Sequence, residues 1–264
     1  METQKVLDHI VDWLKGYCTN AHQKGFVVGI SGGIDSAVTS ALCARTGFPV
    51  LCVEMPIHQA ASQVSRGQEH IAELKNQFSS VSSQIVDLTP TFDSIALVLP
   101  KSENDDAIQL ALANTRARLR MTTLYYLAGL HGFLVAGTGN KVEDFGVGFF
   151  TKYGDGGVDL SPIADLNKTE VYDLAHALGI VASVQKAAPT DGLFGDDRTD
   201  ADQIGASYPE LEWAMDLVSK GTFDRTMLNE RQRVVLSIYE NRHRANLHKM
   251  VPIPVCEIPP ELKN

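Results

Sequence analysis

The eight residues Gly29-Ile30-Ser31-Gly32-Gly33-Ile34-Asp35-Ser36 combine side chains and spacing that can hold an oxyanion. They follow a short apolar run at residues 26–30 and precede a helical pattern. Adjacent glycines let the backbone approach a ligand closely. Serine hydroxyls and the free N–H groups of a helix's first turn donate hydrogen bonds into the same concavity. The segment therefore predicts a cradle for a chain of phosphates.

Two other nucleotide-binding motifs do not fit the sequence. A Walker A loop needs a Gly-Lys-Ser/Thr that does not follow here. The dinucleotide fingerprint fails because Val142 stands where a third glycine belongs after Gly137 and Gly139. A plain strand-to-helix turn would explain the pair Gly32-Gly33 alone, but the full eight-residue context favours the phosphate cradle.

Asp35 is an unexpected residue in a cradle for anions. A carboxylate beside a bound pyrophosphate is repelled unless a cation lies between them. Mg²⁺ prefers oxygen ligands and is commonly held by one or two carboxylates together with phosphates. The motif therefore predicts a magnesium ion.

A strand followed by SGGxDS and a helix resembles the motif of the ATP pyrophosphatases, which include GMP, asparagine, argininosuccinate and NAD synthetases and tRNA thiolation enzymes. Further motifs, in the same order along the chain, resemble those of ammonia-dependent NAD synthetases. They are NTRARLRM at 114–121, GTGNKVE at 137–143, FTKYGDG at 150–156, Pro162 with NKT at 167–169, APT at 188–190 and HK at 248–249. The resemblance spans about residues 25–250.

The resemblance implies a role for each matching position. The residues that would bind ATP are Gly29 to Ser36, Thr138, Lys168 and Thr190. The residues that would contact deamido-NAD⁺ are Arg118, Lys152, Asp159, His248 and Lys249. Asp35 and Glu143 would bind Mg²⁺, although the stretch from Glu143 to Lys152 is one residue longer than in the family pattern. We expect neither carboxylate to have a structural duty.

The implied reaction is a two-step ligation that forms a C–N bond. The nicotinate carboxylate of deamido-NAD⁺ would attack the α-phosphorus of ATP and release pyrophosphate, and ammonia would then displace AMP. Positioning and charge neutralisation suffice for this chemistry, so we expect no covalent protein nucleophile. One alternative is another adenylating amidotransferase or thiolase of the same fold, and a second is a sensor that binds ATP without turnover.

The first half of the chain alternates short apolar runs with helical patterns. Strands are expected at residues 26–30, 50–53 and 83–86, and helices at 35–45 and 59–77. Such alternation is typical of a doubly wound, Rossmann-like α/β fold of the adenine nucleotide alpha-hydrolase type, with a parallel sheet and helices on both faces. The nucleotide would lie across the carboxyl ends of the strands.

The remaining elements follow from similar patterns. We expect an amphipathic helix over residues 6–14, a long helix over 105–129, a strand at 133–136 and helices over 208–219 and 227–243. Asn167 and Glu170 predict a capping box at the start of a helix that ends at Leu178. The glycine-rich segment 146–157 and the turn-rich segment 188–205 are candidate lids over the reactive intermediate.

Composition limits the other possibilities. The 264 residues are 44% hydrophobic and carry a formal net charge of −9, which disfavours nucleic acid as a partner. No signal peptide or membrane span is expected. The four cysteines form no metal-binding pattern and suggest a cytoplasmic protein with reduced thiols. One domain over residues 1–264 is expected, with an extended tail from about 251, and the resemblance implies a homodimer.

Overall fold

The computed structural model describes residues 1–189 and 199–263. Its centre is a parallel sheet of strand order β3-β2-β1-β4. The strands are β1 (Phe26–Gly29), β2 (Val50–Glu54), β3 (Val81–Ile85) and β4 (Leu134–Val135). Val27 pairs with Leu51 on one side and with Val135 on the other. A parallel sheet in this order is the arrangement expected from the alternating sequence pattern.

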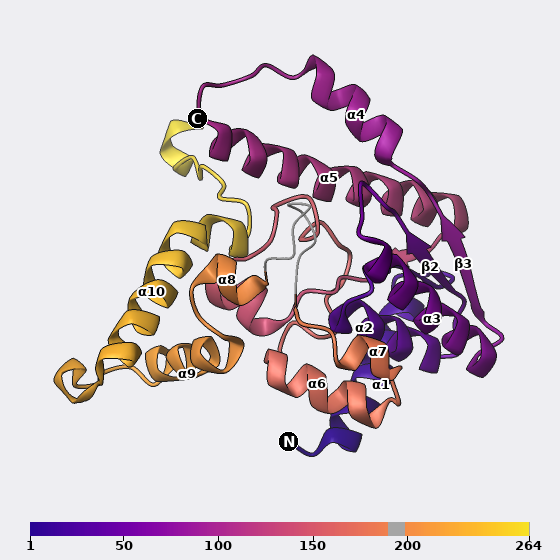
Figure 1. Cartoon of the computed structure of the whole chain (residues 1–264), viewed down its shortest axis with the longest axis horizontal. Coiled ribbons are helices and arrows are strands. Elements are labelled where there is room, and N and C mark those ends of the chain that lie inside the picture. Colours follow the sequence, from indigo (N-terminus) through magenta and orange to yellow (C-terminus); the bar gives the residue numbers. More distant parts are fainter. Residues whose placement is uncertain (190–198, 264) are drawn as a thin grey trace.

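Helices cover both faces of the sheet (Figure 1). One apolar cluster joins the sheet to α1 (Thr3–Asn20), α2 (Ile34–Arg45), α3 (Ala61–Gln77), α6 (Lys168–Ala177) and α7 (Ala182–Gln185). The other joins it to α4 (Thr89–Val98) and α5 (Asp105–His131). Phe26, Val27 and Val28 are completely buried because both faces of β1 are covered. The doubly wound fold is therefore confirmed.

A third apolar cluster lies beside the sheet rather than on it (Figure 1). It forms between η1 (Lys141–Val147), α8 (Asp200–Ile204), α9 (Tyr208–Ser219) and α10 (Glu230–Met250). The 3₁₀ turn η2 (Arg225–Met227) connects α9 to α10. This cluster matters for function because it holds η1, and with it Glu143, against the carboxyl ends of the strands.

Several expected elements differ in the structure. The helix α4 was not predicted, because its apolar residues are not periodic and only Phe92 is buried. The last long helix extends to Met250, so His248 and Lys249 lie on its final turn. The tail is not wholly extended, since it contains the 3₁₀ turn η3 (Pro260–Leu262). Of the candidate lid 188–205, residues 190–198 lie outside the described residues, and the rest includes the helix α8 (Asp200–Ile204), which begins after a capping box at Thr199.

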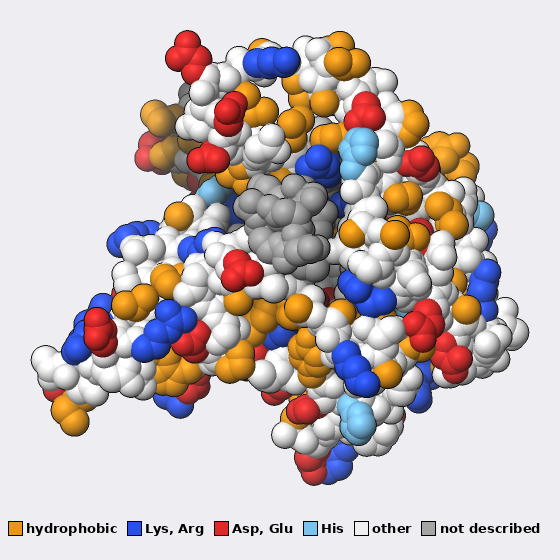
Figure 2. All heavy atoms as spheres, in the orientation of Figure 1, with side chains coloured by type: hydrophobic (Ala, Val, Ile, Leu, Met, Phe, Trp, Pro, Cys, Tyr) orange, Lys and Arg blue, Asp and Glu red, His pale blue; other side chains and the backbone are white. Residues whose placement is uncertain are grey.

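The visible face in Figure 2 carries acidic and basic side chains interspersed, so its described part shows no continuous basic surface. Apolar side chains gather over α4, where Leu97 and Val98 are 83% and 81% exposed. Of the helices in the described ranges, none has the length and apolar character needed to cross a membrane.

Candidate active site

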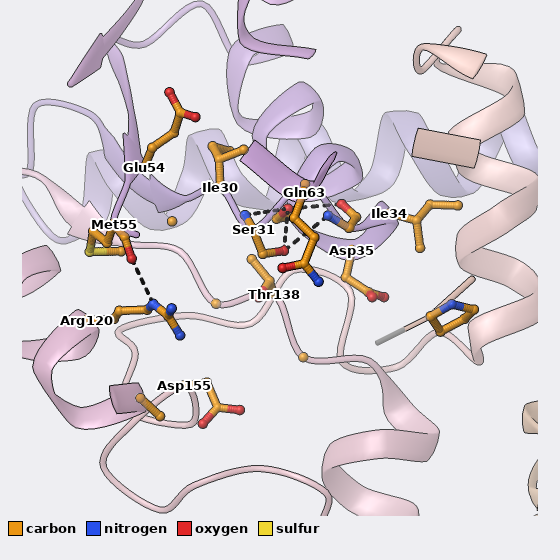
Figure 3. A pocket seen from close by; sticks show the side chains of 18 of the residues that line it. Ile30, Ser31, Ile34, Asp35, Glu54, Met55, Gln63, Arg120, Thr138 and Asp155 are labelled. Carbon is orange, nitrogen blue, oxygen red and sulfur yellow. Dashed lines mark hydrogen bonds between the residues drawn. The ribbon is translucent and has the colours of Figure 1, made fainter. Parts of the chain in front are cut away.

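A cavity of about 300 Å³ opens at the carboxyl ends of the strands. Its lining includes all eight residues of the predicted cradle together with Thr138, Glu143 and Lys168. Figure 3 shows Ser31, Asp35 and Thr138 facing the same space, with Arg120 and Asp155 across from them. The structure thus brings together all the residues expected to bind ATP except Thr190, which lies outside the described residues.

The cradle is shaped by a small network of serine hydrogen bonds. The Ser36 hydroxyl donates to Gly33 O over 3.0 Å and accepts from the Ser31 N–H over 3.3 Å. The Gly33 N–H donates to Ser31 Oγ over 3.2 Å. Gly32 has a positive φ of 81°, which few residues other than glycine adopt. The first-turn N–H groups of α2 have no acceptor within the helix, and the residues that carry them, Ile34, Asp35 and Ser36, line the cavity, as an anion site requires.

Lys168 lies between the two carboxylates that were predicted to bind metal. Its Nζ is 2.5 Å from Asp35 Oδ2 and 2.8 Å from Glu143 Oε1. The lysine side chain is only 4% exposed, and the carboxylates are 17% and 15% exposed. Removing either acid would weaken the pairing of a buried charge. The expectation that Asp35 and Glu143 have no structural duty is therefore wrong.

Burial and charge act against each other in this cluster. Burial lowers the pKa of the Lys168 ammonium, but the two carboxylates outweigh it and raise that pKa above its ordinary value. Burial raises the pKa of Asp35 more than Lys168 lowers it. Burial also tends to raise the pKa of Glu143, but there Lys168 and hydrogen bonds from Lys168 and Tyr208 lower it overall. Lys168 is therefore a fixed cation among the carboxylates.

Asn140 connects the two carboxylates through its completely buried side chain. Its Nδ2 donates to Asp35 Oδ1 over 3.1 Å, and its Oδ1 accepts from the Glu143 N–H over 3.1 Å. Asn140 thereby caps η1, which is a π-helix. A π-helix accommodates an extra residue within a helical turn. A π-helix at 141–147 is therefore compatible with a stretch after Glu143 that is one residue longer than the family pattern.

Tyr208 and Asp200 also belong to the cluster, although nothing in the sequence singled them out. The Tyr208 hydroxyl lies within hydrogen-bond distance of Glu143 Oε1 and 2.6 Å from Asp200 Oδ2. The Lys168 Nζ lies 4.9 Å from the centre of the Tyr208 ring. Both residues lie more than 50 positions from Glu143, so only the folded chain reveals the contact.

Two more carboxylates, Asp144 and Asp155, line the cavity opposite the cradle. Burial, followed by the charge of Asp155, raises the pKa of Asp144 well above its usual range. Asp144 lies so close to Gly139 that a Cβ atom there would meet Asp144 Oδ2 at 1.9 Å. Asp155 accepts a hydrogen bond of 2.9 Å from the Thr151 N–H. Glycine at position 139 therefore makes room for Asp144 rather than for a dinucleotide.

The residues expected to contact deamido-NAD⁺ do not line this cavity, but four of them lie close to one another. Arg118 donates to Lys152 O over 3.3 Å, and Lys152 Nζ donates to His248 O over 2.7 Å. Lys249 Nζ donates to Phe150 O over 2.6 Å and also bonds Gly148 O. These bonds join α5, the glycine-rich segment 146–157 and the end of α10.

Asp159 is separate from that group. Its carboxylate accepts hydrogen bonds from the Val135 N–H over 2.8 Å and from the Tyr125 hydroxyl over 3.0 Å. It therefore supports β4 and α5. Arg116 and Arg120 lie one turn apart on α5, on a different face of the helix from Arg118. Arg116 lies over the Phe92 ring and Arg120 donates to Met55 O.

Comparison with known proteins adds a family to this geometry. A family model described as NAD synthase matches residues 6–252. An NH(3)-dependent NAD(+) synthetase of Mesoplasma florum is 39% identical over 80% of this chain and 84% of that protein. Another from Alkaliphilus oremlandii is 36% identical over 95% of this chain and 97% of that protein.

Solved structures give a similar result. An NMN synthetase from Francisella tularensis superposes with a TM-score of 0.83 at 26% identity, covering 98% of this chain and 100% of that one. An NH3-dependent NAD synthetase from Campylobacter jejuni, in complex with the nitrate ion, superposes with a TM-score of 0.77 at 25% identity, covering 97% and 100%.

Proposed function

The chain belongs to the NAD synthase family of ammonia-dependent ligases, and we propose that its cavity amidates deamido-NAD⁺ to NAD⁺ with ATP. The observation that carries this proposal is the convergence of the phosphate cradle, two carboxylates and one lysine on a single cavity at the carboxyl ends of the strands. This arrangement suits the transfer of an adenylyl group and the departure of a pyrophosphate.

The reaction balances in two steps. A carboxylate oxygen of the nicotinate ring attacks the α-phosphorus of ATP, and the bond to the bridging oxygen breaks to release pyrophosphate. Ammonia then attacks the carbonyl carbon of the mixed anhydride, AMP leaves with the attacking oxygen, and the nitrogen loses a proton. Adenylation is needed because a free carboxylate has no adequate leaving group.

The chain's own groups have separate tasks in the first step. The serine hydroxyls and first-turn N–H groups of the cradle hold the phosphates in line with the attacking oxygen. Thr138, in the loop after β4, and Lys168, at the start of α6, would approach the same phosphates. Lys168 is already fixed by Asp35 and Glu143, so it needs no reorganisation when charge develops on the departing pyrophosphate.

The carboxylates of Asp35 and Glu143 would hold Mg²⁺. They fit this ion by chemistry, because both carboxylates line the cavity beside the phosphate cradle and carboxylate oxygens together with phosphates are the ligands that Mg²⁺ prefers. When bound, Mg²⁺ supplies neutralisation of charge on the phosphates. The carboxylates supply its position, and Asn140 orients one of them.

Deamido-NAD⁺ would lie along the surface formed by Arg118, Lys152, His248 and Lys249. Asp159, which is bonded to the Val135 N–H of β4, would contact it separately. A homodimer would complete this surface. It is supported by Tyr126 and Leu130, which lie one turn apart on α5 and are 67% and 61% exposed. We further propose a cytoplasmic enzyme, which agrees with the reduced, buried thiols of Cys18, Cys43 and Cys52.

A second carboxylic acid is also a candidate substrate. The high TM-score with a structure named NMN synthetase favours nicotinate mononucleotide, the acid corresponding to NMN, as the second candidate substrate. Both acids present the same nicotinate carboxylate, so the adenylation chemistry at the cradle is common to them. The difference lies in whether the surface near Lys152 holds a second nucleotide.

The test is to supply the purified chain with ATP, MgCl₂, ammonium chloride and either acid, and to measure pyrophosphate, AMP and the amide product. We expect all three in equal amounts with deamido-NAD⁺, at a kcat/KM at least about tenfold above that for nicotinate mononucleotide. A preference for the mononucleotide would reassign the substrate. Equal turnover with glutamine in place of ammonium would contradict ammonia dependence, and binding of ATP without turnover would indicate a sensor.

A further inference from the structure

Few of the side chains that line the cavity carry a positive charge that could bind the phosphates of ATP. Among the described residues, six carboxylates line it against three cationic side chains, those of Arg66, Arg120 and Lys168. Lys168 is already held by Asp35 and Glu143. A ligand that carries several negative charges therefore meets a lining in which most of the positive charge is committed elsewhere.

Arg120 is also committed to the protein. Its Nε donates to Met55 O over 3.0 Å, and its Nη2 donates to Gln59 Oε1 over 2.8 Å, as part of the contact between α5 and the loop after β2. Figure 3 shows the Arg120 guanidinium across the cavity from Ser31 and Asp35, held by its hydrogen bond to Met55 O. Arg66 is the remaining cation among the lining residues that the structure describes.

Arg66 is held directly against the phosphate cradle. The helix α3 packs so tightly on the cradle that a Cβ atom on Gly32 would meet Gln63 O at 2.3 Å. One turn further along α3, Arg66 Nε donates to Gly32 O over 3.3 Å. This contact fixes the guanidinium next to the loop that would hold the phosphates.

The other donors of Arg66 point to a ligand. A guanidinium carries five N–H groups in a rigid fork. Within residues 1–189 and 199–263, Arg66 makes the Gly32 hydrogen bond and no ion pair with a carboxylate. Its side chain is half-buried and lines the cavity. Among the described residues neither Nη group has a hydrogen-bond partner, so both can bind an anion with two oxygen atoms, which is the geometry that guanidinium binds best.

We propose that Arg66 binds the β- and γ-phosphates of ATP through its Nη groups and remains on the pyrophosphate as it leaves. The inference rests on the proposed function, because it assigns a further residue to the same adenylation step. It gives the cradle a cation that is not neutralised by Asp35 or Glu143. Arg66 stands within the expected helix 59–77, and no motif in the sequence marked it.

The test measures binding of pyrophosphate and of AMP, each with MgCl₂, by isothermal titration calorimetry. No acid substrate is needed, so the result does not depend on which acid the enzyme amidates. The variants are Arg66→Gln and Arg66→Lys. The matched control is Arg45→Gln, because Arg45 is an exposed arginine at the end of α2, away from the cavity. Melting temperatures show whether each variant folds.

For Arg66→Gln we expect pyrophosphate affinity to fall about 10- to 100-fold, with AMP affinity within about twofold of the parent. Arg66→Lys should retain part of the affinity, because it keeps the charge and loses the fork. The KM for ATP should rise in both variants while the KM for ammonium stays constant. Unchanged pyrophosphate binding in folded Arg66→Gln, or an equal loss for AMP, would overturn the proposal. If Arg66→Gln does not fold, unchanged pyrophosphate binding by Arg66→Lys would overturn it as well.

Discussion

Lys168 Nζ lies 2.5 Å from Asp35 Oδ2, although the two residues are 133 positions apart in the chain. This ion pair joins the first turn of α2 to the first turn of α6 beneath the cavity. A lysine at a helix start opposes the helix dipole, so it needs an anionic partner, and Asp35 provides one. The same lysine also donates to Glu143, which lies on η1. Three separate segments are therefore held together at the proposed phosphate site by one ammonium group.

Replacing Asp35 by Asn should lower the rate of adenylation by roughly two orders of magnitude or more. The side chain keeps its shape but loses the charge that would hold Mg²⁺ beside the departing pyrophosphate. Glu143→Gln should behave alike, with part of the loss recovered at high Mg²⁺. Pyrophosphate release under single-turnover conditions measures the effect.

The matched control is Asp165→Asn, because Asp165 pairs with Lys141 on the surface and its side chain is 96% exposed. It should leave the rate unchanged. Near-normal turnover of Asp35→Asn would contradict the assignment. If only Glu143→Gln were silent, Asp144 would be the next candidate, since it follows in the same helical turn and lines the cavity.

Replacing Lys168 by Met should affect both stability and activity. The change leaves Asp35 and Glu143 close together without their shared cation, which we expect to cost about 3 kcal/mol of unfolding free energy or more. Adding MgCl₂ should raise the melting temperature of Lys168→Met more than that of the parent, because the freed carboxylates can bind the ion. Calorimetric melting with and without MgCl₂ checks this. Equal shifts in both proteins would contradict a metal site at these carboxylates.

Much of the local structure could be predicted because its signals are contiguous. The apolar run at 26–30 followed by Gly32-Gly33 specifies a strand, a tight turn and a helix start. Asn167 and Glu170 form the expected capping box, in which the Asn167 N–H donates to Glu170 Oε2 over 2.9 Å. The resemblance placed Asp35, Glu143 and Lys168 in one site, and the structure shows them in contact.

The parts that could not be predicted depend on contacts between distant segments. Tyr208 reaches Glu143 only because α9 packs on η1, and no local pattern records that packing. The π-helix at 141–147 arises where the buried cap Asn140 and the third apolar cluster hold both ends of a segment. In the sequence Arg66 is one of several polar residues of an amphipathic helix. Only the packing of α3 against Gly32 shows that it lies next to the cradle.

Stability should depend on pH through His70. This side chain is 2% exposed, and its Nε2 lies 2.9 Å from Ser40 Oγ. Burial lowers the pKa of His70 to about 4, so the folded protein binds fewer protons than the unfolded chain between about pH 4 and 6.5. The His70 contribution is present above pH 6.5 and is lost as the pH falls toward 4. It amounts to about 3 kcal/mol.

Urea unfolding at several pH values tests this dependence. His70→Gln should be less sensitive to pH between 6.5 and 4 than the parent, whereas the exposed control His9→Gln should keep the parent's slope. Identical slopes for the parent and His70→Gln would show that His70 is not the titrating group.

The proposed dimer gives a further prediction. If the exposed apolar residues of α5 form the interface, Leu130→Glu should favour the monomer. The change places a charge within that interface, at a side chain that is 61% exposed in the single chain. Light scattering at micromolar concentration should give about twice 28.8 kDa for the parent. A mass near 28.8 kDa for the parent would contradict the dimer.

Adenylation of a carboxylate at this cradle can be tested most directly by following its oxygen atoms. The measurement uses deamido-NAD⁺ labelled with ¹⁸O in the nicotinate carboxylate, together with ATP, MgCl₂ and ammonium chloride. Because the carboxylate attacks the α-phosphorus and ammonia displaces AMP, each AMP should carry one ¹⁸O atom and the pyrophosphate none. AMP without the label, or release of ADP and phosphate instead, would contradict the account.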